Sequence, residues 1–205
     1  MHSSDPRELL SALARIFKKL KIPYIVTGGI AVLVWGRPRF TADIDIVVEL
    51  EKDRAAVFRK ALLSLGKAGY LDLDAMMEAL ALEGEFNFIH GESGVKVDFW
   101  ILKKQDDFDI ARFKRKKVKT IFGEKINFIS PEDLILMKLK WHRESGSARQ
   151  LEDVESILKI SGKKLDMKYL KKWASKFGVS GVLRSLSSDH CFCGSEKKYK
   201  RCHGR

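Results

Sequence analysis

The stretch that decides the fold is TGGIAVLVWGRPRFTADIDIVVE, residues 27–49. Two adjacent glycines, Gly28 and Gly29, follow a short apolar run, and two aspartates, Asp43 and Asp45, stand one residue apart among Ile and Val. A carboxylate within an apolar strand is costly unless a cation compensates its charge. The stretch therefore predicts a strand, a glycine turn, a short helix and a second strand whose aspartates bind a cation.

The acidic residues of this stretch are expected to act together with a third. Side chains alternate along a strand, so Asp43 and Asp45 share one face, about 6.5 to 7 Å apart. Asp98 is flanked by apolar residues in VKVDFW, which also reads as a strand. Three such carboxylates repel one another without a cation, and hard oxygen ligands favour Mg²⁺ or Mn²⁺. We therefore expect a divalent-metal site formed by Asp43, Asp45 and Asp98.

The glycine pair stands where a strand is expected to end and a helix to begin. Backbone amides at a helix N-terminus favour an anion, and glycine lets a phosphate approach the backbone closely. Taken alone, such a pair is more often structural than functional. Beside three strand acids, Gly28 and Gly29 indicate a nucleotide-binding turn.

The remaining pattern indicates an α+β fold, with a mixed sheet in the first 130 residues and helices after it. Pairs of apolar runs around GESG and FGEK predict two hairpins. The segment 103–115 reads as a charged connection, and the polar segment 180–190 reads as a linker. Strands are expected at 24–27, 43–49, 86–90, 95–102, 116–121 and 126–129, and helices at 6–20, 28–36, 53–65, 72–82, 130–143, 149–160 and 166–177.

The formal net charge of +12 is unevenly distributed. Residues 161–205 contain twelve Lys or Arg against three Asp or Glu, whereas the rest of the chain has 27 against 24. A basic C-terminal part suggests a polyanionic partner such as RNA, or a protein partner. The alternative is that these lysines only keep helices soluble. No apolar run is long enough for a membrane span, and the N-terminal stretch reads as a helix rather than an export signal, so we expect a cytoplasmic protein.

The three cysteines of the chain all fall within its last fifteen residues. A disulfide framework would spread them along the sequence and pair them evenly. Three thiolates and one imidazole instead match a closed tetrahedral Zn²⁺ site, which is structural rather than catalytic. The expected ligands are Cys191, Cys193, Cys202 and His203.

The order of these motifs resembles the nucleotidyltransferase superfamily of DNA polymerase beta. The text around them, RFTADIDIVV and SPEDLILMKL, looks like the minimal or AbiEii-type bacterial enzymes. The resemblance implies a nucleotidyltransferase-type mixed β-sheet flanked by helices. It also implies that Asp43 and Asp45 bind two Mg²⁺ ions, while Asp98 holds the second ion and helps to deprotonate the attacking hydroxyl. The implied reaction transfers NMP from an NTP and releases pyrophosphate.

The C-terminal tail closely resembles the SEC-C motif, a small zinc knuckle that serves as a docking module for proteins or nucleic acid. With it, the expected division is a catalytic core over 1–130, a helical part over 131–178 and a zinc-binding tail over 186–205.

Two cations are further candidates for nucleotide binding. Arg39 lies just before the acidic strand, where it meets either a phosphate or solvent. Lys138, on the helix that Ser130 begins, matches a lysine that relatives turn toward the triphosphate, although a plain surface lysine fits the pattern as well. Asp153 is expected to orient a helix or to pair with a base such as Arg149.

The sequence allows several classes of molecule to supply the acceptor hydroxyl. RNA, for example tRNA, and a macromolecular partner in a toxin–antitoxin or phage-defence setting are favoured by the basic C-terminal part. The alternatives are a noncatalytic nucleotide-binding protein that docks through its zinc knuckle, and an enzyme that modifies a small molecule such as an antibiotic.

Overall fold

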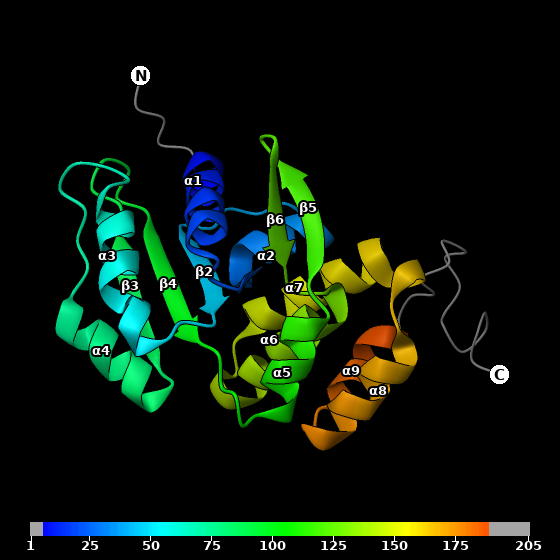
Figure 1. Cartoon of the computed structure of the whole chain (residues 1–205). Helices are drawn as coiled ribbons and strands as arrows, with labels where there is room; N and C mark the ends of the chain where they lie inside the picture. Colours follow the sequence, from blue (N-terminus) through cyan, green and yellow to red (C-terminus); the bar gives the residue numbers. More distant parts are fainter. Residues whose placement is uncertain (1–5, 189–205) are drawn as a thin grey trace. The chain divides into compact units, whose positions relative to one another are not determined.

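The computed structural model of the chain describes residues 6–188 (Figure 1). It divides into two compact units, one made of Met1–Ile30 and Phe40–Ile129 and the other of Ala31–Arg39 and Ser130–Arg205. The fold is α+β, as the sequence predicts, with a six-stranded mixed sheet in the first unit. No helix within 6–188 combines the length and the apolar character needed to cross a membrane. The predicted zinc ligands lie outside the described residues.

The sheet has the strand order β3-β4-β2-β1-β6-β5. Strand β2 runs parallel to β4 and antiparallel to β1, and β1 is parallel to β6. The two predicted hairpins are confirmed as antiparallel pairs, β3 with β4 and β5 with β6. The strands are β1 (Tyr24–Thr27), β2 (Asp43–Val48), β3 (Glu85–Ile89), β4 (Lys96–Ile101), β5 (Lys117–Ile121) and β6 (Glu124–Phe128).

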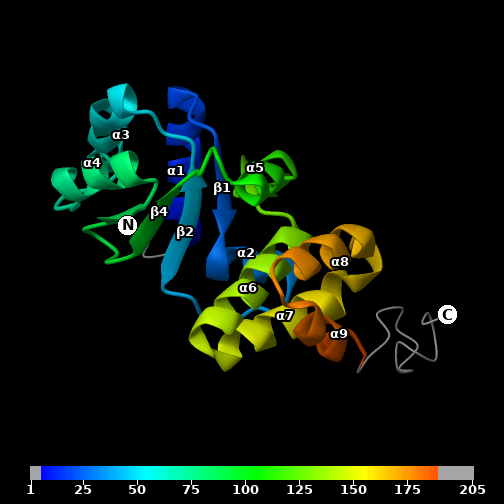
Figure 2. The ribbon, with the colours of Figure 1, turned by 90° about the horizontal axis from the view of Figure 1, so that it is seen from below.

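Helices of the first unit pack on one face of the sheet (Figure 2), and aromatic side chains lie between them and the strands. The Phe58 ring lies 5.6 Å from Phe17 and 5.5 Å from Phe99, and the rings of Phe86 and Phe99 are 5.1 Å apart. Burying each such ring contributes roughly 2 to 3 kcal/mol. This aromatic cluster joins the helices to the middle of the sheet. The helices are α1 (Pro6–Leu20), α3 (Ala55–Leu63), which follows the 3₁₀ turn Lys52–Arg54, and α4 (Leu73–Leu82).

Two segments that the sequence assigns to connections are helical, so that assignment is wrong in both. Helix α5 (Asp107–Lys114) begins at Asp106, whose carboxylate accepts hydrogen bonds from the backbone N–H groups of Phe108 and Asp109. Helix α9 (Ser180–Ser188) occupies the expected linker. Its Leu183 is buried, so apolar packing compensates for the poor helix propensity of its serines.

The second unit contains α6 (Pro131–Ser145), α7 (Ala148–Ser161), the 3₁₀ turn Gly162–Lys164, α8 (Met167–Lys176) and α9. The hydroxyl of Ser130 caps α6 by accepting from Asp133 N, and Tyr169 on α8 donates to Asp133 Oδ1 at 2.7 Å. Residues 31–39 also belong to this unit, because the Ser161 hydroxyl donates to Trp35 O and Gly36 lies against Ser156. Helix α2 (Gly28–Trp35) therefore begins in one unit and ends in the other.

Candidate active site

Three aspartates of the first unit lie on one face of two adjacent strands. Asp45 on β2 is the register partner of Asp98 on β4, and Asp43 is the partner of Lys96. Their side chains are half-buried, whereas the alternate residues on both strands are fully buried on the opposite face. Strand alternation and parallel pairing thus gather Asp43, Asp45 and Asp98 on the same side, as the sequence predicts.

The glycine turn lies directly against this acidic group. Strand β1 ends at Thr27 and α2 begins at Gly28, whose φ of +59° is unfavourable for any residue with a Cβ. A Cβ on Gly28 would lie 1.7 Å from Asp45 Oδ2, and one on Gly29 would lie 2.3 Å from Thr41 Oγ1. Both glycines are therefore required by the packing of the turn against the acidic strand and the residues just before it.

Lys96 is part of the acidic group, although the sequence reading did not include it. Its Nζ lies 2.8 Å from Asp98 Oδ2, and the two side chains are 43% and 18% exposed. The hydrogen bond to Asp98, followed by the charges of Asp98, Asp43 and Asp45, raises the pKa of Lys96 above its ordinary value. The field of all three carboxylates thus reaches one ammonium. Strand alternation provided the signal, since Lys96 is two residues before Asp98.

The donor chemistry of the three acids suits a hard divalent cation, because Mg²⁺ and Mn²⁺ prefer carboxylate oxygens. The strand register, which sets Asp45 opposite Asp98, agrees with such a site. As the side chains stand, no group of three or more His, Cys, Asp or Glu within 6–188 is gathered closely enough to hold a metal ion. The residues thus fit a metal in donor type and register, while Asp98 is engaged by Lys96.

A second charged cluster lies within the other unit. Asp153 on α7 has a side chain only 3% exposed and accepts two hydrogen bonds from Arg39, with distances of 2.7 Å from Nε and 2.9 Å from Nη2. Lys138 Nζ lies 2.8 Å from the Oδ2 atom of the same carboxylate. Lys138 is buried, so it is not the plain surface lysine that its helix pattern allows. Asp153 does pair with bases, but these are Arg39 and Lys138, whereas the sequence suggested Arg149.

The two cations determine the protonation state of Asp153. Burial alone would raise the pKa of this carboxyl, but hydrogen bonds and charges from Arg39 and Lys138 outweigh burial and hold the pKa below its ordinary value. The cluster carries one net positive charge, since two cations share one carboxylate. The carboxylate therefore holds both cations in place.

The candidate residues thus form two groups, one in each compact unit. Gly28, Gly29 and the three aspartates come together around β2, and Arg39 and Lys138 come together on Asp153. Sequence reasoning missed the second association because Arg39 and Asp153 are 114 positions apart. The spacing of residues within a helix or strand cannot predict an ion pair between positions so far apart in the sequence.

Comparison with known proteins gives a family for nearly the whole chain. The family model described as a nucleotidyl transferase of unknown function (DUF2204) matches residues 7–187. The model of the SEC-C motif matches residues 188–205. No curated protein matches the chain.

Solved structures share the fold at low sequence identity. An antigenic nucleotidyltransferase-like protein from Paracoccidioides brasiliensis is 16% identical, with a TM-score of 0.56 and coverage of 99% of each chain. The antibiotic-resistance factor ANT(2″)-Ia is 13% identical, with a TM-score of 0.55 over 88% of this chain and 95% of its own. JHP933 from Helicobacter pylori is 13% identical, with a TM-score of 0.51 over 96% and 84%. At these identities the likeness concerns the fold alone.

The Asp153 cluster predicts a specific order of stabilities. Asp153→Asn should lower the free energy of unfolding at pH 7 by about 3 kcal/mol, because it leaves two cations without their carboxylate. Lys138→Met should cost less, because Arg39 still binds Asp153 with two hydrogen bonds. Denaturant unfolding of both variants measures the difference. Equal losses would contradict this account of the cluster.

The same cluster predicts how the cost of Asp153→Asn depends on pH. The pKa of Asp153 is lowered in the folded state, so its contribution is complete above the unfolded pKa of about 4 and is lost as the pH falls through the folded value. The stability gap between wild type and Asp153→Asn should therefore narrow below about pH 4. A gap that stays constant down to acid unfolding would show that the carboxylate charge is not responsible.

Proposed function

Since the chain belongs to the nucleotidyl transferase family of unknown function designated DUF2204, we propose that it transfers NMP from an NTP to a hydroxyl of RNA, with release of pyrophosphate. The observation that carries this proposal is the shared face of Asp43, Asp45 and Asp98, pressed against the Gly28 turn. A carboxylate group of this kind serves a divalent cation at a phosphoryl-transfer centre. A macromolecular partner other than RNA is the alternative acceptor.

The residues have distinct roles in this reaction. Asp43 and Asp45 are proposed to hold the cation that accompanies the triphosphate, and Asp98 to orient the acceptor hydroxyl and take up its proton. A bound Mg²⁺ or Mn²⁺ supplies the positive charge that offsets the phosphate oxygens. The acceptor oxygen forms a bond to the α-phosphorus as the bond from that phosphorus to pyrophosphate breaks. We propose that Asp98 would also hold a second metal ion.

Arg39 and Lys138 are proposed to contribute to triphosphate binding. Their shared carboxylate, Asp153, keeps both side chains fixed. Loss of either cation is then expected to raise the KM for NTP more than it lowers kcat, because the interaction is present in the bound substrate and in the transition state alike.

Asp45→Asn tests the proposed reaction most directly. The variant should lose transfer activity by more than about a hundredfold, because even groups that only support metal ligands cost 10- to 100-fold. Its Tm should be unchanged or raised, because one of three mutually repelling carboxylates is removed. Asp53→Asn, which changes an exposed acid of the same unit, is the matched control. Labelled NTPs, Mg²⁺ and total RNA provide the assay, and activity retained by Asp45→Asn would refute the assignment.

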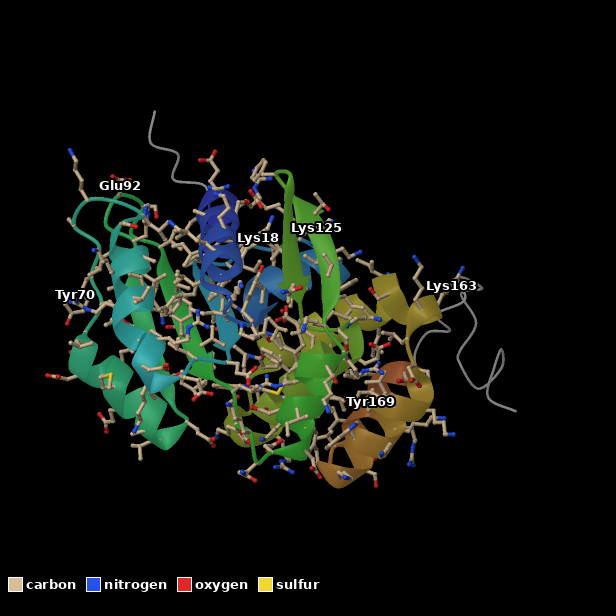
Figure 3. The ribbon with its side chains drawn as sticks, viewed as in Figure 1. Lys18, Tyr70, Glu92, Lys125, Lys163 and Tyr169 are labelled. Atoms are coloured by element: carbon tan, nitrogen blue, oxygen red, sulfur yellow. The ribbon has the colours of Figure 1, made fainter. Side chains whose placement is uncertain are left out.

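RNA is preferred as the acceptor because exposed cations gather on one part of the first unit. Helix α1 contacts β6, the Arg7 guanidinium lies 5.3 Å from the centre of the Phe122 ring, and Arg15 pairs with Glu124 at 3.4 Å. Figure 3 labels Lys18 and Lys125 on these neighbouring elements. We name this group the α1–hairpin surface; its exposed cations are Arg7, Arg15, Lys18 and Lys19 on α1 and Lys117, Lys119 and Lys125 on the hairpin.

Charge totals along the chain do not indicate this surface. Outside 161–205 the totals nearly cancel, yet residues 112–125 contain seven Lys or Arg and one acid, Glu124. Lysines on an exposed edge strand also prevent pairing with other chains. That role accounts for Lys117 and Lys119 on β5, but not for the cations of α1. Phe122, 58% exposed at the hairpin turn, adds a ring on which a base can stack.

Charge reversal on the hairpin tests the RNA proposal. Lys117→Glu, Lys119→Glu and Lys125→Glu together should weaken RNA binding and flatten the slope of log affinity against log salt by about 2. The matched control reverses the exposed Lys52, Lys60 and Lys67 of the same unit and should change binding far less. If both triple variants weaken RNA binding equally, the net charge of the protein and not the α1–hairpin surface determines RNA binding. Absence of RNA binding in wild type would favour a protein or small-molecule acceptor.

The SEC-C match at residues 188–205 supports a separate proposal for the tail. Cys191, Cys193, Cys202 and His203 are proposed to hold one structural Zn²⁺, and the knuckle to dock onto RNA or a protein partner through its basic residues. Such a site has no open position for chemistry.

The tail proposal predicts one zinc per chain in protein purified without added metal. Cys193→Ser should release it, because a closed tetrahedral site needs all four ligands. Elemental analysis measures the content. Transfer to a small model acceptor should survive removal of residues 189–205, and loss of that activity would contradict a purely docking role.

A further inference from the structure

The ion pair between Lys96 and Asp98 lies inside the proposed metal site. Both residues are on β4, two positions apart, so their side chains leave the same face of the sheet. The register with β2 sets Lys96 opposite Asp43 and Asp98 opposite Asp45. The ammonium is 2.8 Å from Asp98 Oδ2. The acidic group therefore contains one resident cation.

The charges of these four groups limit what the site can accept. Taken by themselves, three carboxylates and one ammonium carry a net charge of minus two. As the side chains stand, the three acids are not gathered into a metal-binding group, and Asp98 is engaged by Lys96. A carboxylate that accepts a hydrogen bond from an ammonium at this distance is occupied by a competing cation.

We propose that Lys96 is the built-in counterion of this site and competes with divalent metal for Asp98. In the metal-free protein the ammonium offsets repulsion among the carboxylates, and it leaves Asp98 when that side chain ligates a metal ion. This inference rests on the proposed function only in taking the three acids as metal ligands. Lys96 is a positioning residue, because it acts through Asp98.

The mobility that this exchange needs is available to Lys96. Its side chain is 43% exposed, so the ammonium can swing into water while its stem stays on the sheet. An ion pair with a partner this exposed contributes little to folding. Lys104 offers a comparison in the same unit, since it is 49% exposed and pairs with Glu49 and Glu51, away from the three aspartates on β2 and β4.

Direct binding of Mn²⁺, without nucleotide, tests the proposal. Calorimetric titration should show that Lys96→Met binds Mn²⁺ about tenfold more tightly than wild type, because a positive charge close to the ion has been removed. Lys96→Arg, which keeps the charge, should bind close to wild type. Lys104→Met makes the same change in net charge and should also match wild type.

Thermal unfolding gives a second readout that a merely structural ion pair would not produce. In EDTA, Lys96→Met should unfold at a slightly lower temperature than wild type, because the ammonium that pairs with Asp98 is then removed. Saturating Mn²⁺ should remove that deficit and give the variant a larger metal-induced rise in Tm. A deficit of the same size with and without Mn²⁺ would overturn the proposal.

The outcomes also separate this proposal from the proposed function. If wild type binds Mn²⁺ and Asp45→Asn does not, but Lys96→Met binds no more tightly than wild type, the metal site stands and the counterion role is refuted. If wild type binds no Mn²⁺ and transfers no nucleotide, both fail. Tighter Mn²⁺ binding by Lys96→Met alone among the lysine variants supports the counterion role.

Discussion

Repulsion among three carboxylates on one face of a sheet is the constraint on which the first unit depends. Adjacent strands lie about 4.8 Å apart, and Asp45 and Asp98 are register partners across such a pair. Apolar burial of the alternate residues on the opposite face fixes the register, since a shift by one residue would bury the acids and expose Ile44 and Val97. The charged face cannot relax by slipping, so its repulsion has to be met by a cation.

The second unit presents the inverse arrangement. There one buried carboxylate, Asp153, is shared by Arg39 and Lys138, so cations are in excess by one. Removing the carboxylate would leave like charges together, as removing Lys96 would in the first unit. Each cluster is thus held by attraction between opposite charges within its own unit.

Local patterns explain which features the sequence predicts correctly. The acidic strand, the glycine turn and the Ser130 cap depend on residues close in sequence, and all are found as expected. Helix α9 was missed because serines lower its local propensity, while the packing that stabilises it comes from the folded unit. The pairing of Arg39 with Asp153 is equally non-local. Strand alternation places Lys96 on the same face as Asp98, but an ammonium is not a metal ligand, so the expected donor set did not point to it.

The contact between Gly28 and Asp45 bears on whether the fold is used for catalysis or only for docking. The Asp45 carboxylate occupies the space that a Cβ on Gly28 would fill, so the glycine turn and the acidic strand depend on each other for their packing. A protein that only held nucleotide would need the turn but not three acids, and replacing one acid by an amide would relieve repulsion. Keeping all three has an electrostatic cost that binding alone does not require. The proposed phosphoryl transfer with a metal uses all three, so this arrangement supports the proposed enzyme rather than the docking protein.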